Sequence, residues 1–248
     1  MKAEVLDLQG KVVKEIELPQ VFESKINKTL IERAFWIIFT HKLQPKGRDP
    51  TAGMKVSAES WGTGYGIARI ARIKGSGTPR AGQAGGVASV VKGRLAHPPK
   101  AEKKIYKNLN KKERLMATAS AIASTAVLEL VKERGHKYEG KLPLIVVDDA
   151  EKLSKAKDVA SFLMSLGLDK ELERTKEKGV GPLIVVSSRS SSVAKAAGNI
   201  PGVEVVTGKD LSVLHLAPGG KPGRLTIFTE SALRQIEERF KVIGAYGR

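Results

Sequence analysis

A long glycine-rich, basic stretch from residue 44 to residue 100 limits what this chain can fold into. It contains eleven of the chain's 25 glycines, ten lysines or arginines and only two acids. A connection of this length without its own core is rare inside a compact domain, and such segments are usually functional or disordered. We therefore expect a globular domain built from residues 1–43 and 105–248, with residues 44–104 inserted as a long extended basic loop.

The residues on either side of this stretch have the pattern of an α/β protein. Residues 1–18 alternate around a turn at Gln9-Gly10, which predicts a β-hairpin. Asn27 is an expected N-cap for a helix over residues 29–41, and residues 111–134 predict a second helix that ends at Gly135. The loop is therefore expected between the first two helices.

The second half of the chain alternates short apolar runs with helical patterns. Such runs are typical of strands that are buried on both faces, and the alternation predicts a mainly parallel sheet with helices on both faces. The strands are expected at Leu142–Val147, Leu183–Val186, Val203–Val206, Val213–Leu216 and Leu225–Phe228, and the helices at residues 151–166, 191–197 and 230–240.

The overall charge indicates a polyanionic partner. The formal net charge is +17 and the isoelectric point is about 10.0, an excess that favours binding to nucleic acid. A membrane surface is the weaker alternative, because there is no apolar run of about 18 residues and no basic amphipathic helix. The chain has no cysteine, and its N-terminus lacks the apolar region of a signal peptide, so we expect a cytoplasmic protein.

Candidate catalytic and cofactor sites are weak. The glycines do not follow a strand and open a helix, and no Gly-Lys-Ser/Thr phosphate loop is present. Asp148 and Asp149 could hold a metal, but capping of the next helix is favoured. Residues 187–192 could contact a phosphate, although a serine-rich turn with an N-cap is favoured. The four histidines lack metal-site spacing, so we expect no enzyme activity, no metal and no cofactor.

The basic stretch carries the features of an RNA-binding segment. Cations recur every few residues, as phosphate neutralisation requires, and aromatic rings offer stacking faces for unpaired bases. Apolar residues persist within the stretch, which favours a segment ordered by its partner over a solvated tail. The predicted RNA-binding residues are Lys46, Arg48, Lys55, Trp61, Tyr65, Arg69, Arg72, Lys74, Arg80, Lys92, Arg94, His97, Lys100, Lys103 and Lys104.

The sequences from Ser57 to Gly64 and from Arg69 to Gln83 resemble the universal ribosomal large-subunit protein four family, in its archaeal and eukaryotic branch. The similarity extends over nearly the whole chain, including the Val-Val-Asp-Asp sequence at residues 146–149. The resemblance implies a structural protein of the large ribosomal subunit, with an α/β domain on its outside and a loop threaded into ribosomal RNA.

The resemblance also implies a role for the tip of the loop. In that family the tip helps line the nascent-peptide exit tunnel beside a loop of another ribosomal protein. By position, the tip is expected near residues 69–78, and the tip residues are Arg69, Ile70, Arg72, Lys74, Gly75, Ser76 and Gly77. The implied partners are large-subunit ribosomal RNA, neighbouring ribosomal proteins and the nascent peptide, without a membrane and without homo-oligomerisation.

The residues alone are also compatible with two other functions. One is an RNA-modifying or nucleotide-using enzyme on a doubly wound fold, which needs a cofactor pocket at the carboxyl ends of the strands. The other is a DNA-architectural protein, which would prefer duplex DNA to structured RNA.

Overall fold

The structure, a computed structural model, describes residues 1–177 and 179–241. These residues form two compact units, which are described separately below. The first unit combines Met1–His41 with the chain from Lys107 onward, and the second unit is Lys42–Tyr106.

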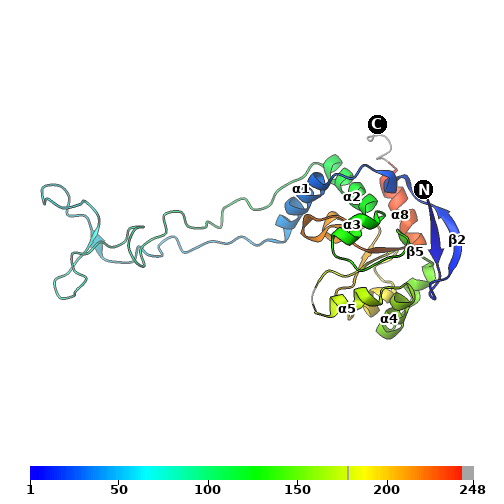
Figure 1. Cartoon of the computed structure of the whole chain (residues 1–248). Helices are drawn as coiled ribbons and strands as arrows, with labels where there is room; N and C mark the ends of the chain where they lie inside the picture. Colours follow the sequence, from blue (N-terminus) through cyan, green and yellow to red (C-terminus); the bar gives the residue numbers. More distant parts are fainter. Residues whose placement is uncertain (178, 242–248) are drawn as a thin grey trace. The chain divides into compact units, whose positions relative to one another are not determined.

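The first unit contains a mixed six-stranded sheet in which most neighbours are parallel (Figure 1). The strand order is β2-β1-β5-β8-β6-β7, and only the β1–β2 pair is antiparallel. The strands are β1 (Lys2–Leu6), β2 (Val12–Glu17), β5 (Leu144–Val146), β6 (Leu183–Val186), β7 (Glu204–Thr207) and β8 (Thr226–Thr229). The predicted hairpin and α/β class are confirmed, with the hairpin adding an antiparallel edge to the parallel strands.

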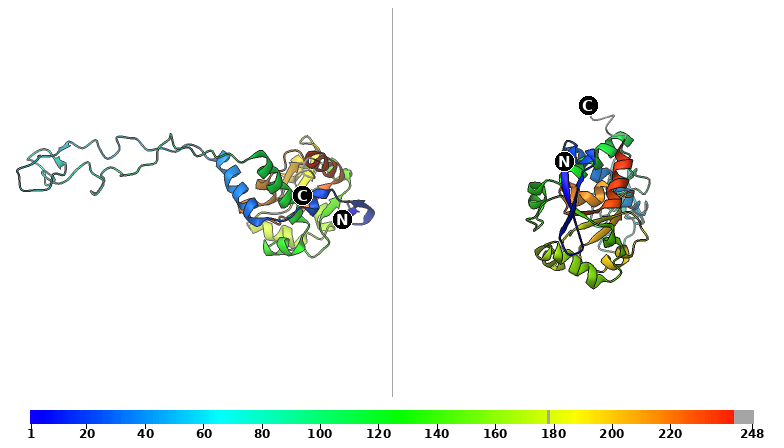
Figure 2. Two further views of the ribbon diagram at one scale, coloured as in Figure 1. Left: turned by 90° about the horizontal axis from the view of Figure 1, so that it is seen from above. Right: turned by 90° about the vertical axis from the view of Figure 1, so that its right-hand side faces the viewer.

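Helices cover both faces of this sheet (Figure 2). One core contains buried residues of α1 (Lys28–Phe39), α2 (Lys111–Thr125), α7 (Val213–Leu216) and α8 (Glu230–Phe240). The other contains buried residues of α3 (Leu128–Glu133), α4 (Ala156–Ser165), α5 (Asp169–Glu177) and α6 (Ser192–Ala197). Short 3-10 helices lie at Gln20–Glu23, Thr40–Lys42, Asp148–Lys152 and Pro218–Gly220.

The central strands are apolar at successive positions because each face has its own core. Ile145 and Phe228 point into the core with α8, whereas Leu144 and Ile227 point into the core with α4. Side chains alternate between the two faces of a strand, so a strand covered on both faces loses its polar positions. This is the reason that the short apolar runs predicted a buried parallel sheet.

Two local predictions at helix ends are confirmed. Asn27 caps α1, since its Oδ1 accepts a hydrogen bond from the backbone N–H of Leu30 at 3.0 Å. Gly135 follows α3 with a φ of +98°, and its N–H donates to the carbonyl of Lys132. A left-handed residue after the last turn is a common helix ending that glycine adopts without steric cost.

One predicted strand is wrong, because residues 213–216 form the helix α7. Val213 and Leu216 are both buried, at the i, i+3 spacing of a helix face. A run of four apolar residues fits a buried strand and a buried helix equally, so periodicity could not separate the two.

The predicted helix boundaries also need correction. The helix expected over residues 111–134 is divided into α2 and α3 by a break at Ala126–Val127. The helix expected over residues 151–166 starts only at Ala156, and α5 was missed. The buried side of α5 includes the polar residues Glu171 and Thr175, which hide its apolar periodicity.

Candidate nucleic-acid interface

The second unit, Lys42–Tyr106, is organised around a small antiparallel pair of strands. Strand β3 (Ala58–Glu59) pairs with β4 (Arg72–Ile73), and Ala84 forms a bridge to Arg72 on the other side of β4. The N–H of Lys74 donates to the carbonyl of Ser57, and the N–H of Ile73 donates to that of Gln83, both at 2.9 Å. Three segments of the unit therefore meet here through backbone hydrogen bonds.

The two ends of the unit approach each other through their backbones. The N–H of Arg48 donates to the carbonyl of Pro99 at 3.0 Å. A Cβ atom on Gly53 would lie 2.5 Å from the carbonyl oxygen of Gly93. The backbone of residue 53 also has a φ of +83°, which residues other than glycine rarely adopt. A larger residue would clash at this position, so Gly53 permits the close approach.

The cations of this unit are presented to solvent. Of the predicted RNA-binding residues, only Arg72 is half-buried, and the other fourteen, including Trp61, Tyr65 and His97, are exposed. Exposed guanidinium and ammonium groups keep their donors available for phosphate oxygens. The structure thus gives each of them except Arg72 a position from which it could reach an external polyanion.

The two acids within the basic stretch are each paired with a lysine. Lys55 lies 3.2 Å from Asp49, and Lys74 pairs with Glu59. Hydrogen bonds from the backbone and side chain of Thr51 lower the pKa of Asp49, and the Lys74 hydrogen bond lowers the pKa of Glu59. Both acids therefore stay ionised at neutral pH and offset only a small part of the positive charge.

Arg72 contributes to the local structure rather than projecting into solvent. Its Nη1 donates to the carbonyl of Gly82 at 2.8 Å, and its guanidinium carbon lies 5.7 Å from the ring centre of Trp61. The Trp61 and Tyr65 rings are 6.0 Å apart at an interplanar angle of 62°. Sequence reasoning did not identify this internal role, because the Gly82 carbonyl carries no sequence signal.

The predicted tip residues are divided by strand β4. Ile70 and Arg72 are half-buried next to the paired strands, whereas Arg69 and the run from Lys74 to Gly77 are exposed. A Cβ atom added to Gly75 or Gly77 would meet nothing within 4 Å. The assignment of these residues to a tip stays a prediction.

The carboxyl edge of the parallel sheet is occupied by hydrogen bonds within the protein. The prediction that Asp148 caps the helix that follows it is wrong. Its two carboxylate oxygens accept from the N–H of Ser231, at 2.8 Å, and from its hydroxyl, at 2.6 Å. Ser231 lies in the first turn of α8, so Asp148 caps that helix. The two residues meet because β5 and β8 are neighbouring parallel strands whose carboxyl ends lie side by side.

Glu151 and the serine-rich turn are also joined by hydrogen bonds within the protein. Glu151 accepts hydrogen bonds from the N–H and hydroxyl of Ser187, both at 2.7 Å, and from the hydroxyl of Thr229 at 2.8 Å. A carboxylate at this position would repel a phosphate bound to Ser187. These contacts tie three strand ends together, so they favour a structural role for the turn.

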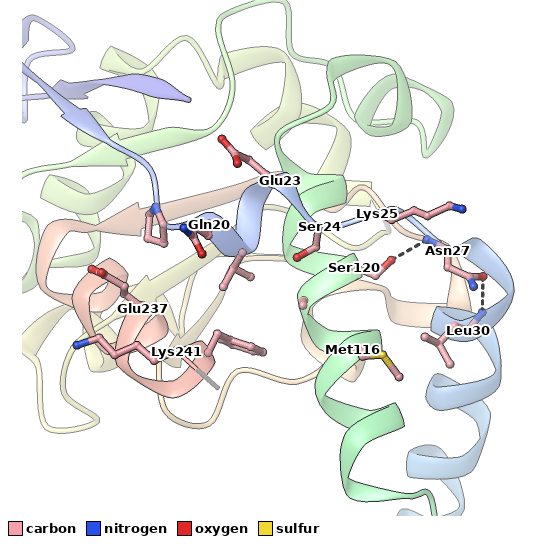
Figure 3. Close-up of a pocket in the computed structure, with 14 residues that line it drawn as sticks. Gln20, Glu23, Ser24, Lys25, Asn27, Leu30, Met116, Ser120, Glu237 and Lys241 are labelled. Carbon is pink, nitrogen blue, oxygen red and sulfur yellow. Dashed lines mark hydrogen bonds between the residues drawn. The ribbon is translucent and has the colours of Figure 1, made fainter. Parts of the chain in front are cut away.

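A groove on the first unit lies away from these strand ends (Figure 3). Its volume is about 810 Å³, and it is lined by residues of the segment 19–27, by Leu30 of α1, by residues of α2, and by the end of α8 with the following Lys241. Ser120 on α2 accepts a hydrogen bond from the N–H of Asn27 at 2.7 Å, which ties the segment to α2. Because α8 starts at the carboxyl edge of the sheet, its last turn marks the opposite edge, where a doubly wound enzyme does not bind its cofactor.

The part of the chain that the structure describes contains neither a metal-binding cluster nor a membrane-spanning helix. Within residues 1–177 and 179–241, no group of three or more histidines or acids is placed to hold a metal ion. None of the helices in that part of the chain combines the length and the apolar character needed to cross a bilayer.

The fold and the exposed cations define an α/β protein with a separate basic unit suited to a polyanion. Comparison with known proteins identifies the family: the profile of the Ribosomal protein L4/L1 family matches residues 16–239. The chain is 46% identical to the large ribosomal subunit protein uL4 of Sulfolobus acidocaldarius, over 97% of this chain and 95% of that protein. It is also 46% identical to the uL4 protein of Methanocaldococcus jannaschii, over 97% of this chain and all of that protein.

The chain therefore belongs to the Ribosomal protein L4/L1 family. Membership makes it a ribosomal protein of the archaeal type, a cytoplasmic component of translation and not an enzyme. The resemblance noted in the sequence is confirmed.

Proposed function

We propose that this chain is a structural constituent of the large ribosomal subunit that binds ribosomal RNA through residues 44–104. In this proposal those residues act as an extended loop that penetrates the RNA. Residues 1–43 and 105–248 form the domain that anchors it beside neighbouring ribosomal proteins, as a single chain rather than a homo-oligomer. The observation that carries the proposal is the exposure of all the predicted RNA-binding residues except Arg72.

Counterion release explains why many dispersed cations suit this task. Each phosphate neutralised by a lysine or arginine releases condensed counterions, and the contributions of many contacts add. Backbone carbonyls and rings within the same unit offer further contacts to sugars and unpaired bases, which RNA presents more readily than duplex DNA does. The unit therefore fits a folded RNA better than a DNA duplex.

The finer part of the proposal concerns the tip. We place Arg69, Ile70, Arg72 and residues 74–77 beside the nascent-peptide exit tunnel. Support comes from the resemblance of the sequence around Lys74 to the family's tip and from the open space around Gly75 and Gly77. Small residues can line a narrow passage without blocking it.

The salt dependence of RNA affinity tests the RNA contacts. In the full chain, Arg69, Arg80 and Arg94 are replaced together by glutamine, and affinity for a large-subunit RNA fragment is measured from 50 to 300 mM salt. These arginines are exposed and lie outside the paired strands. The slope of log K against log salt is expected to flatten by about 2, since each lost phosphate contact removes roughly 0.7–0.9.

A matched variant controls for net charge. Lys155, Lys157 and Lys195 are exposed in the first unit, and their joint replacement by glutamine removes the same charge. In this control the slope of log K against log salt is expected to change by less than half of the change seen in the triple arginine variant. Equal slopes for the two triple variants would contradict RNA binding by the second unit.

The tunnel assignment has its own test. A photoreactive amino acid at Ser76 is expected to crosslink a stalled nascent peptide in assembled ribosomes, whereas the same group at Lys157 is not. Crosslinks from position 76 to RNA alone would contradict a position next to the peptide.

A further inference from the structure

The aromatic pair in the second unit has one ring face that is already occupied. The guanidinium of Arg72 lies over the Trp61 ring at 5.7 Å, and Tyr65 meets the ring at an angle of 62°. Even so, 51% of the surface of Trp61 and 65% of that of Tyr65 remain exposed. More than half of the surface of each residue is therefore still open to a ligand.

Arg72 is fixed in this place by the small sheet. It belongs to β4, its Nη1 donates to the Gly82 carbonyl at 2.8 Å, and its Nε is buried. A guanidinium held in this way orients the ring it covers, since the cation–π attraction depends on a position over the ring face. Arg72 therefore lies over the Trp61 ring from a fixed position in β4.

The glycines next to the two aromatic residues in the sequence lie in open space. A Cβ atom added to Gly62, Gly64 or Gly66 would meet nothing within 4 Å. The cation Arg69 is exposed and lies just before β4 in the sequence, whereas Lys74, just after β4, is paired with Glu59. An open aromatic face with positive charge around it is the arrangement by which proteins bind unpaired bases, because every base has a π face and a phosphate next to it.

We propose that Trp61 and Tyr65 form a stacking site for one unpaired RNA base, which stacks on the exposed surface of these rings. Arg72 is a positioning residue of this site and not a phosphate contact. The inference rests on the proposed binding of ribosomal RNA by the second unit and adds the chemical group that is recognised there.

The test compares two single-stranded RNA probes of equal length and charge. One is an oligoadenylate of eight nucleotides, and the other has the same backbone with every base removed. The full-length wild-type protein is expected to bind the base-bearing probe at least roughly tenfold more tightly, as a single stacked base contributes that much. Trp61→Ala is expected to abolish this preference without changing the salt dependence.

Trp36→Ala is the matched control. Trp36 is 53% exposed on α1, close to the exposure of Trp61, but belongs to the first unit. This variant is expected to keep the preference for the base-bearing probe. A preference that persists in Trp61→Ala, or is lost equally in Trp36→Ala, would overturn the stacking site.

The role of Arg72 is tested with the same probes. Arg72→Gln is expected to reduce the preference and leave the salt slope unchanged, and Arg72→Lys to restore part of it because a cation remains near the ring. A slope that flattens as much as in Arg69→Gln would show a phosphate contact and contradict the positioning role.

Fluorescence gives a second measurement in case a variant folds poorly. The chain has two tryptophans, so Trp36→Phe leaves Trp61 as the single reporter. Its emission is expected to be quenched by the base-bearing probe and not by the abasic one, and equal quenching would contradict stacking.

These results separate the two proposals. If both probes bind equally, with a slope that depends on Arg69, Arg80 and Arg94, RNA binding stands and the stacking site fails. If neither probe shows such a slope, the proposed function itself fails.

Discussion

Glu171 is a buried acid whose charge is satisfied by three neighbours. It is fully buried, and its carboxylate accepts from His136 at 2.6 Å, from the N–H of Lys137 at 3.0 Å and from two nitrogens of Arg174. Burial alone would raise its pKa, but these hydrogen bonds outweigh it and hold the pKa at about 2, below the usual 4.5. The residue thus ties α5 to the chain that follows α3.

This pKa predicts a stability change at low pH. A carboxyl whose pKa is lowered on folding stabilises the fold above its unfolded pKa, near 4.5, and this contribution is lost as the pH falls towards 2. Glu171→Gln is expected to lower the free energy of unfolding by about 3 kcal/mol at pH 7 and to remove this part of the acid dependence. Urea unfolding between pH 2 and pH 7 measures both effects.

Glu173→Gln is the control for this prediction, since Glu173 is exposed on the same helix. It is expected to change the unfolding free energy by less than about 0.5 kcal/mol. An acid dependence that is the same in Glu171→Gln as in the wild type would contradict the account of this residue.

At the scale of elements, the parallel order of the strands decides which residues meet. Asp148 follows β5, and its partner Ser231 follows β8, more than eighty residues later in the chain. The sequence predicts that an acid at a strand end caps a helix, and this is correct in kind. It cannot identify the helix, because the strand order β5-β8-β6 is set by tertiary packing.

The adjacent acids Asp148 and Asp149 supply a stability prediction and its control. Asp148→Ala is expected to destabilise the fold by about 1–2 kcal/mol, since two hydrogen bonds to the first turn of α8 are lost. Asp149→Ala removes an exposed acid that pairs with Lys152 and is expected to cost less than about 1 kcal/mol. Thermal unfolding of both variants measures the difference, and equal losses would contradict capping by Asp148.

At the scale of the whole molecule, the sequence predicts the class of the fold and the location of its basic segment. Composition alone separates residues 44–100 from the rest, since charge and glycine are local properties of the chain. The helix α7 could not be predicted because four apolar residues fit a strand and a helix equally. The internal position of Arg72 could not be predicted because its acceptor, the Gly82 carbonyl, carries no sequence signal. The RNA-binding residues that the sequence predicts best are therefore those that need only be exposed to solvent to contact RNA.

Limited proteolysis tests how the two units differ in stability. Trypsin is expected to cut the free protein first within Lys42–Tyr106, because few regular hydrogen bonds protect that backbone and its lysines and arginines are exposed. Mass spectrometry of the early fragments identifies the cuts. First cuts within the strands or helices of the other unit would contradict this expectation.

Crosslinking in the intact large subunit tests the central claim most directly. A benzophenone amino acid in place of Tyr65, an exposed residue of the second unit, is activated by light, and the crosslinked products are mapped. The account predicts that most of the crosslinked product joins position 65 to large-subunit ribosomal RNA, at a defined set of nucleotides. Crosslinks to protein alone, or to no defined RNA site, would contradict it.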